Sequence, residues 1–211
     1  MTYKCVIFDL DGTLVHTRPE YRYDVLGKTL EKFGKSSSKN EIDRFWFEGN
    51  RDKIIRECFG LGIDDFWETF RECDAVESRK KFIEAYDDVD FIHKLRKKNF
   101  KTGIVTGAPQ EIMSMNLEII GSENFDTIIS AYGLNGIEPK PSPDGIERCL
   151  ATFRLKNSEA VYVGNADEDV GTARNARVFS VLINRREYDF SHLKPDLVIN
   201  SLYELGSLLS L

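Results

Sequence analysis

Two aspartates near the start of the chain have the type and spacing to do chemistry together. Asp9 and Asp11 directly follow the apolar run Cys5–Phe8, and Gly12 comes next. Because side chains along extended backbone alternate with a period of two, the two carboxylates point roughly the same way. Two negative charges placed together are costly unless they share a cation or a proton. The pair therefore favours a functional site, with an ordinary Asp-Gly surface turn as the plain alternative.

Two other segments offer groups that bind anions. Thr106 and Gly107 follow the apolar run 103–105 and present a hydroxyl and backbone N–H groups, although a satisfied turn threonine is the simpler explanation of this segment alone. Lys140 lies in the segment 138–143, whose three prolines fix the backbone. Rigid presentation of a cation suits a phosphate site, and a solvated lysine in a stiff loop explains the segment equally well.

An acidic segment follows a later apolar run. Residues 160–163 are apolar, and Asn165, Asp167, Glu168 and Asp169 come soon after, with no basic residue among them. Oxygen donors of this kind suit a hard cation such as Mg²⁺. Acidic residues also stabilise a helix N-terminus, and both interpretations can hold at once.

Strand-like and helical runs alternate through most of the chain and would bring these segments together. Continuous apolar strands alternating with helices predict an α/β fold, with a Rossmann-like parallel sheet covered by helices on both faces. Ligands bind at the carboxyl ends of the strands in such sheets, so we expect the four segments to meet there. The predicted strands are 5–8, 103–105, 127–129, 160–163, 180–183 and 197–199, with helices at about 91–99, 109–120, 143–153 and 169–176 and a short terminal helix.

One long region interrupts this alternation. From about Arg18 to Tyr86, apolar residues recur at helical spacing, and a capping-box pattern at Ser38 opens one of the helices. The sequence therefore predicts an inserted α-helical domain at 16–86 and an α/β domain formed by 1–15 and 87–211.

Composition limits the partners of the protein. Among 211 residues, 29 Lys and Arg face 35 Asp and Glu, which gives a net charge of −6 at pH 7 and predicts no nucleic-acid partner. No run approaches the ~20 apolar residues of a membrane span, so no membrane partner is expected. The first apolar run stops at Asp9, which predicts no signal peptide, and four widely spaced cysteines fit a reducing cytoplasm. Monomer and homodimer remain open.

Taken in order, the four segments resemble the motifs of the haloacid dehalogenase superfamily. Residues 9–15 are similar to its DxDGT nucleophile motif, and Thr106 is similar to its second-motif Ser/Thr. Lys140 matches its third-motif lysine, and residues 164–169 resemble its GDxxxD motif. The resemblance covers nearly the whole chain. The inserted helices lie where subgroups related to phosphoglycolate phosphatase and β-phosphoglucomutase carry their cap domain.

The resemblance implies a Mg²⁺-dependent phosphatase acting on a small phosphorylated metabolite. Asp9 would form an aspartyl phosphate, and Asp11 would protonate the leaving oxygen and later deprotonate water. Thr106 and Lys140 would complete the catalytic set by holding phosphate oxygens, and Lys140 could pair with Asp9 when no substrate is bound.

The same resemblance implies binding roles for further residues. Phosphate or substrate would be bound by Leu10, Gly12, Gly107 and Arg51. Arg51 lies in the predicted cap turn 49–52, and an ordinary surface arginine explains it equally well. The metal ligands would be Asp9, Asp11 through its carbonyl, Asn165, and Asp169 directly or through water. Asn165 departs from the family pattern, which has an aspartate there, and so the site loses a negative charge.

The same motifs are compatible with other functions. A sugar-phosphate mutase would use all four, and a non-catalytic binding protein could retain the fold. A phosphonatase would need a cap lysine such as Lys28, Lys32 or Lys53, none of which lies in a distinctive motif. A dehalogenase is disfavoured, because that branch lacks the equivalent of Asp11.

Overall fold

The computed structural model describes residues 3–133 and 136–211, so residues 1–2 of the predicted α/β domain lie outside it. The chain divides into two compact units. The α/β unit contains the residues up to His16 together with Glu84–Leu211, and the helical unit is Thr17–Ile83. His16 and residues 84–86, which the sequence analysis assigned to the insertion, therefore fall in the α/β unit.

A six-stranded sheet forms the centre of the α/β unit. Its strand order is β5-β4-β1-β6-β7-β8, and every pairing between neighbours is parallel. The α/β fold class and all six predicted strands are confirmed. Their bounds are β1 Cys5–Phe8, β4 Lys101–Thr106, β5 Thr127–Ser130, β6 Ala160–Gly164, β7 Phe179–Ile183 and β8 Leu197–Ile199.

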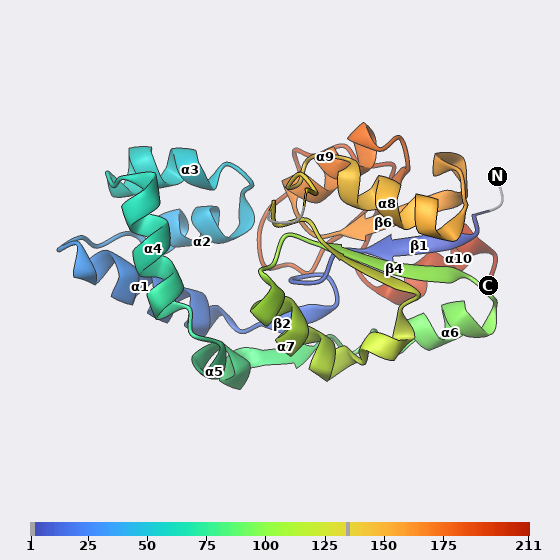
Figure 1. Cartoon of the computed structure of the whole chain (residues 1–211), viewed down its shortest axis with the longest axis horizontal. Helices are drawn as coiled ribbons and strands as arrows, with labels where there is room; N and C mark the ends of the chain where they lie inside the picture. The colour runs from blue at the N-terminus through green and yellow to red at the C-terminus, as the bar shows by residue number, and fades with distance from the viewer. Residues whose placement is uncertain (1–2, 134–135) are drawn as a thin grey trace. The chain divides into compact units, whose positions relative to one another are not determined.

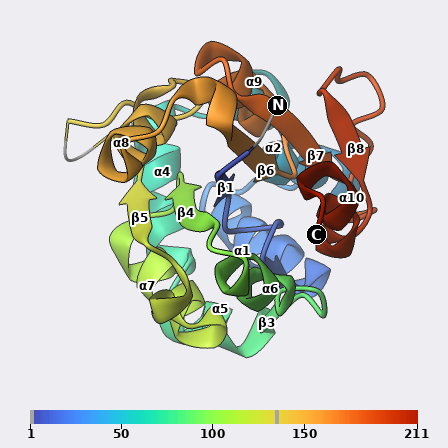
Figure 2. The same cartoon turned by 90° about the vertical axis from the view of Figure 1, so that its right-hand side faces the viewer.

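Helices cover both faces of this sheet, as the continuous apolar strands predict. In Figures 1 and 2, α8 and α9 lie on one face, and α6 and α7 lie on the other. The helices are α6 Phe91–Lys97, α7 Gln110–Ile120, α8 Asp144–Phe153, α9 Asp167–Asn175 and the short α10 Leu205–Leu209.

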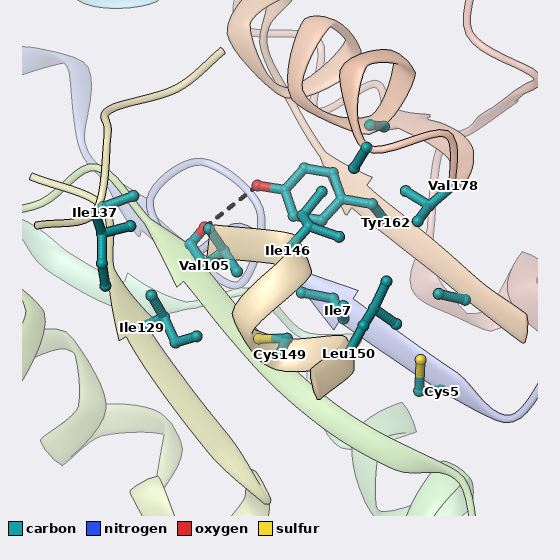
Figure 3. Close-up of a cluster of buried hydrophobic side chains, with 14 residues drawn as sticks. Cys5, Ile7, Val105, Ile129, Ile137, Ile146, Cys149, Leu150, Tyr162 and Val178 are labelled. Carbon is teal, nitrogen blue, oxygen red and sulfur yellow. Dashed lines mark hydrogen bonds between the residues drawn. The ribbon is translucent and has the colours of Figure 1, made fainter. Parts of the chain in front are cut away.

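The layer between the sheet and α8 is almost wholly apolar (Figure 3). Ile146, Cys149 and Leu150 of α8 pack over Ile7 of β1 and its neighbours. Tyr162 of β6 lies in the same layer and is 1% exposed. Its hydroxyl is a polar group in an apolar layer, and it must find a partner there.

The helical unit has its own apolar core. Its centre is the Phe66 cluster (Phe45, Phe59, Phe66 and Phe70), whose contacting rings have centroids 5.2 to 5.9 Å apart. The predicted capping box at Ser38 is confirmed. The helices are α1 Pro19–Lys32, α2 Lys39–Phe47, α3 Arg51–Ile54, α4 Ile63–Cys73 and α5 Val76–Arg79, with a π-helical turn at Ile55–Phe59.

The prediction of nearly continuous helix from about Arg18 to Tyr86 is wrong at its C-terminal end, and a second short strand precedes it. The connecting segments form β2 (Val15–Thr17) and β3 (Ile83–Ala85), which pair in a two-stranded sheet. Strands of three residues are too short to carry a periodic signal, and each depends on a partner far away in the sequence. Within the described part of the chain, no helix has the length and apolar character needed to cross a membrane.

Candidate active site

The predicted functional segments converge at the carboxyl ends of three neighbouring strands. Asp9 follows β1, Thr106 ends β4, and Asn165 follows β6, and β1 lies between the other two (Figure 1). The Asp9 N–H donates to the carbonyl of Val163 at 2.8 Å, which extends the β1–β6 ladder by one residue. The parallel sheet therefore places these side chains at one edge, as predicted.

Lys140 lies between two buried carboxylates. Its Nζ is 2.6 Å from Asp9 Oδ1 and 2.7 Å from Asp169 Oδ1, and the three side chains are 3 to 8% exposed. We call this group the Lys140 triad. The predicted pairing of Lys140 with Asp9 is confirmed, and it links the segment before α8 to the end of β1.

The charges of the Lys140 triad do not balance. Burial raises the pKa of the Asp9 carboxyl, and the ammonium of Lys140 opposes this only in part. Burial alone would lower the pKa of Lys140, but the carboxylates of Asp169 and Asp9 outweigh it and raise the pKa well above its usual value. Since one ammonium cannot neutralise two buried carboxylates, the site favours a second positive charge beside Asp9.

The Asp169 carboxylate already has four donors. Its Oδ1 accepts from Lys140 Nζ and from the Tyr162 hydroxyl at 3.0 Å. Its Oδ2 accepts from the backbone N–H groups of Asn165 and Ala166 at 3.1 and 3.0 Å. Two bonds to each oxygen use the accepting capacity of a carboxylate. Asp169 therefore orients Lys140 and the loop after β6. With its oxygens occupied, it would affect a metal ion through these groups or through water.

Asn165 and Asp9 direct oxygens at a common group. Thr13 Oγ1 is 3.1 Å from Asp9 Oδ2 and 3.3 Å from Asn165 Oδ1. Gly12 permits this approach, because its φ is +76° and a Cβ there would lie 2.3 Å from Asn165 Nδ2. Gly12 therefore makes room for Asn165, and its predicted role in binding phosphate remains a prediction.

The donor types at this edge fit Mg²⁺. Among residues 3–133 and 136–211, no group of three or more His, Cys, Asp or Glu side chains could hold a metal ion. A cation would instead use mixed oxygen donors, namely the Asp9 carboxylate, the Asn165 amide and the Asp11 carbonyl that the sequence analysis suggested. Mg²⁺ is commonly held by one or two carboxylates together with other oxygens, so this donor set is suitable.

Asp11 has a partner that the sequence analysis missed. Its Oδ1 accepts a hydrogen bond from Asn116 Nδ2 at 2.9 Å. Asn116 lies on α7 and is 0% exposed. An asparagine inside a helical run gives no sequence signal of such a contact, because its partner is far away in the chain.

Thr106 and Gly107 have geometry that suits phosphate binding. Thr106 Oγ1 accepts from the Ala108 N–H at 3.1 Å, so its own hydroxyl hydrogen can still donate to an anion. A Cβ built on Gly107 would meet nothing within 4 Å. The assignment of both residues to phosphate remains a prediction that this geometry favours.

Leu10 shapes the loop after β1. Its side chain is fully buried, and its carbonyl accepts from the N–H groups of Thr13, Leu14 and Val15 at 2.9 to 3.3 Å. These bonds close the tight turn on which Asp11 lies. The predicted contact of Leu10 with phosphate remains a prediction.

A buried ion pair also supports this loop. The guanidinium of Arg185 donates to the Thr13 carbonyl at 2.6 Å and to both oxygens of Asp88 at 2.8 and 2.9 Å. Burial would raise the pKa of Asp88, but the bonds from Arg185 and the Leu202 N–H lower it overall. Neither residue lies in a motif, so the sequence alone did not predict this pair.

Tyr162 also supports the site, and the sequence alone did not predict this role. Its hydroxyl lies 3.2 Å from the Val105 carbonyl (Figure 3) and 3.0 Å from Asp169 Oδ1. Lys140 Nζ lies 5.7 Å from the centroid of its ring. Tyr162 thus touches both charged partners from within the sheet, and a tyrosine in an otherwise apolar strand was the available signal.

Arg51 belongs to the helical unit. It begins α3, and its Nε donates to the Phe45 carbonyl at 3.2 Å. This bond gives Arg51 a structural contact within its own unit. Its role toward substrate remains a prediction.

The fold and this edge of the sheet define a known class of enzyme. The family model of haloacid dehalogenase-like hydrolases matches residues 6–183, and the chain belongs to this family. It is similar to pyrophosphatase PpaX of Halalkalibacterium halodurans, with 26% identity over 224 residues that cover 97% of this chain and 96% of that protein. PpaX of Bacillus cereus (strain G9842) is 24% identical over 215 residues, covering 100% of this chain and 98% of that protein.

Solved structures share the fold over the whole chain. A Lactobacillus plantarum protein aligns with a TM-score of 0.85 at 22% identity, covering 99% of this chain and 100% of that one. A predicted phosphoglycolate phosphatase of Haemophilus somnus aligns with a TM-score of 0.78 at 18% identity, covering 99% of this chain and 98% of that one. At these identities the likeness concerns the fold alone.

Proposed function

We propose that the protein is a Mg²⁺-dependent phosphatase that hydrolyses a small phosphorylated metabolite through an aspartyl phosphate on Asp9. The observation that carries this proposal is the Lys140 triad, which holds a buried carboxylate at the carboxyl edge of the sheet with a second carboxylate, Asp11, two residues away. The names of the relatives, pyrophosphatase and phosphoglycolate phosphatase, support phosphate ester or anhydride substrates. In this proposal the helical unit acts as the cap domain.

In the first step, an Asp9 carboxylate oxygen attacks phosphorus. The bond between phosphorus and the leaving oxygen breaks, its electron pair stays on that oxygen, and Asp11 supplies the proton. Lys140 and the Thr106 hydroxyl stabilise the charge on the phosphoryl oxygens, which is the main work in phosphoryl transfer.

In the second step, water attacks phosphorus of the aspartyl phosphate. Asp11, now a carboxylate, takes a proton from the water, and Asp9 leaves with the electron pair of the broken O–P bond. Free inorganic phosphate and the original protonation of both residues result. Two easier displacements thus replace a single difficult one.

Mg²⁺, when bound by Asp9, Asn165 and the Asp11 carbonyl, would supply positive charge that offsets the repulsion between a carboxylate and a phosphate. The Lys140 triad favours a second positive charge beside Asp9, and a metal ion bound there would provide it. Asp169 would act through Lys140 and through the loop that carries Asn165.

The test is a screen of the full-length protein against phosphorylated metabolites, inorganic pyrophosphate and an aryl phosphate, with and without Mg²⁺. We expect release of inorganic phosphate that requires Mg²⁺ and disappears in Asp9→Asn. Transfer of phosphate to a second sugar hydroxyl would indicate the mutase instead. Folded protein that releases no phosphate from any substrate would contradict the proposal.

A further inference from the structure

A fully buried asparagine interrupts the apolar face of α7. Asn116 is 0% exposed and follows Ile112 and Met113 at intervals of four and three residues, with Ile120 four residues later; all three neighbours are buried. Burying an amide costs free energy unless its groups are hydrogen-bonded. An apolar residue at this position would continue the stripe and avoid the cost. The asparagine therefore needs a reason beyond packing.

Only the NH₂ group of the Asn116 amide has a hydrogen-bond partner among the described residues. Nδ2 donates to Asp11 Oδ1 at 2.9 Å. Oδ1 is buried and has no hydrogen-bond partner among the described residues. A buried acceptor without a partner destabilises the folded state. The benefit of asparagine at this position therefore lies in the hydrogen bond that its NH₂ group donates. That donor is aimed at the residue assigned as the acid and base.

We propose that Asn116 is a positioning residue that fixes the orientation of the Asp11 carboxyl and selects the oxygen that carries its proton. An oxygen that accepts the Nδ2–H bond is the less favourable place for a proton, so the proton is carried on Oδ2. Rotation of the carboxyl would break the bond to Asn116. The inference rests on the proposed phosphatase function, and it adds a residue from outside the four motif segments.

The chemical type of the donor suits this role. The donor on Asp9 is the ammonium of Lys140, which favours a charged carboxylate, as a nucleophile requires. The donor from Asn116 is a neutral amide, which orients the Asp11 carboxyl through a directed hydrogen bond and carries no charge of its own. Two carboxylates at one site thus receive different partners, in keeping with their different roles.

Leaving-group dependence distinguishes positioning from packing. In the first step, the Asp11 proton passes to the leaving oxygen as its bond to phosphorus breaks. An alkyl oxygen needs that proton, whereas an aryl oxygen such as that of 4-nitrophenol leaves readily as an anion. A misplaced acid therefore slows the cleavage of an alkyl phosphate more than the cleavage of an aryl phosphate. The value of kcat/KM reports on this first step.

The experiment compares Asn116→Leu and Asn116→Ala with wild type at saturating Mg²⁺. The substrates are 4-nitrophenyl phosphate and the best alkyl phosphate from the metabolite screen. We expect kcat/KM to fall about tenfold or more for the alkyl phosphate and less than about threefold for the aryl phosphate. Because Leu removes the unpaired amide oxygen, the melting temperature of Asn116→Leu should equal or exceed that of wild type.

Two further variants make the comparison decisive. Asp11→Asn removes the acid itself and should show the same selectivity, with a larger loss. Met115→Leu changes a buried neighbour on α7 by a volume-conserving swap and should leave the ratio of the two substrates unchanged.

Equal losses on both substrates, or no loss on either, would overturn the inference while leaving the phosphatase intact. Unfolding of both Asn116 variants while Met115→Leu folds would overturn it too, since Asn116 would then be structural. A wild type that hydrolyses neither substrate would instead remove the proposed function, and the inference with it.

Discussion

The two units bury opposite kinds of side chain. The Phe66 cluster of the helical unit joins aromatic rings, whose burial stabilises the fold and needs no further partner. The Lys140 triad of the α/β unit buries three charged groups that do not balance, and the amide oxygen of Asn116, which donates to Asp11, has no hydrogen-bond partner among the described residues. The comparison teaches that the core of the helical unit is stabilised by apolar burial, whereas this edge of the sheet buries charges at a cost in stability, as the proposed function would require. Four changes test that distinction.

The largest effect is expected from Asp9→Asn. An amide cannot act as the nucleophile, so turnover should fall at least a thousandfold, which is about 4 kcal/mol of barrier. Phosphate release by the purified variant, at matched protein concentration, measures the loss. Residual activity within about tenfold of wild type would contradict the role of Asp9.

The same variant should be more stable than wild type when divalent cations are removed. The pKa of Asp9 is raised on folding, so the folded state binds a proton that the unfolded state releases. Wild-type stability should therefore fall as pH rises from about 4 toward neutrality, and Asn at this position removes that dependence. Melting temperatures across this pH range in EDTA provide the measurement, and a flat wild-type curve would contradict the charge imbalance.

A second large effect is expected in the other unit. Phe66→Ala removes a ring at the centre of the Phe66 cluster and should cost about 3–5 kcal/mol of the stability of the helical unit. Both tryptophans of the chain, Trp46 and Trp67, lie in this unit, so tryptophan fluorescence during urea unfolding reports on it alone. Val198→Ala, at a position 51% exposed in the α/β unit, is a control that should leave this unfolding midpoint unchanged. A Phe66→Ala midpoint equal to that of Val198→Ala would break the comparison.

Lys140→Ala should affect both properties. In the proposed mechanism it removes the cation that stabilises the phosphoryl oxygens, so kcat should fall about 10²–10³-fold, with a smaller rise in KM. It also leaves two buried carboxylates without their ammonium, which should destabilise the α/β unit. Lys140→Arg should restore activity only in part, because a planar guanidinium cannot replace a compact ammonium between the two carboxylates. Wild-type kinetics in either variant would place Lys140 outside the site.

The smallest effect is expected from Asn165→Asp. A full negative charge beside Asp9 should tighten Mg²⁺ binding about tenfold, or about 1.4 kcal/mol, after desolvation and repulsion are offset. Titration calorimetry with Mg²⁺ and the Mg²⁺ concentration for half-maximal activity both measure it. Unchanged or weaker binding would show that Asn165 is not a ligand, and the loop after β6 would need a new assignment.

The sequence alone predicted where the six strands lie along the chain and which candidate site residues follow them. Continuous apolar runs predicted six strands, with bounds that differ from the structure by at most two residues. Motifs predicted three of the site residues, Asp9, Lys140 and Asp169. Such a motif is a short run of residues that contains both the residues that form the turn and the side chains suited to the chemistry. These features are local, so local sequence is sufficient to predict them.

Only the tertiary structure decided which side chains support the site. Asn116 donates to Asp11 across 105 positions of sequence, and Arg185 reaches the Thr13 carbonyl across 172. The four donors on Asp169 also became visible only in three dimensions, and they favour contact with a metal through water over direct ligation. Such contacts depend on where distant elements pack, and a single polar residue in an apolar run does not reveal its partner. The pairing of β2 with β3 escaped prediction for the same physical reason, since neither strand is stable without the other.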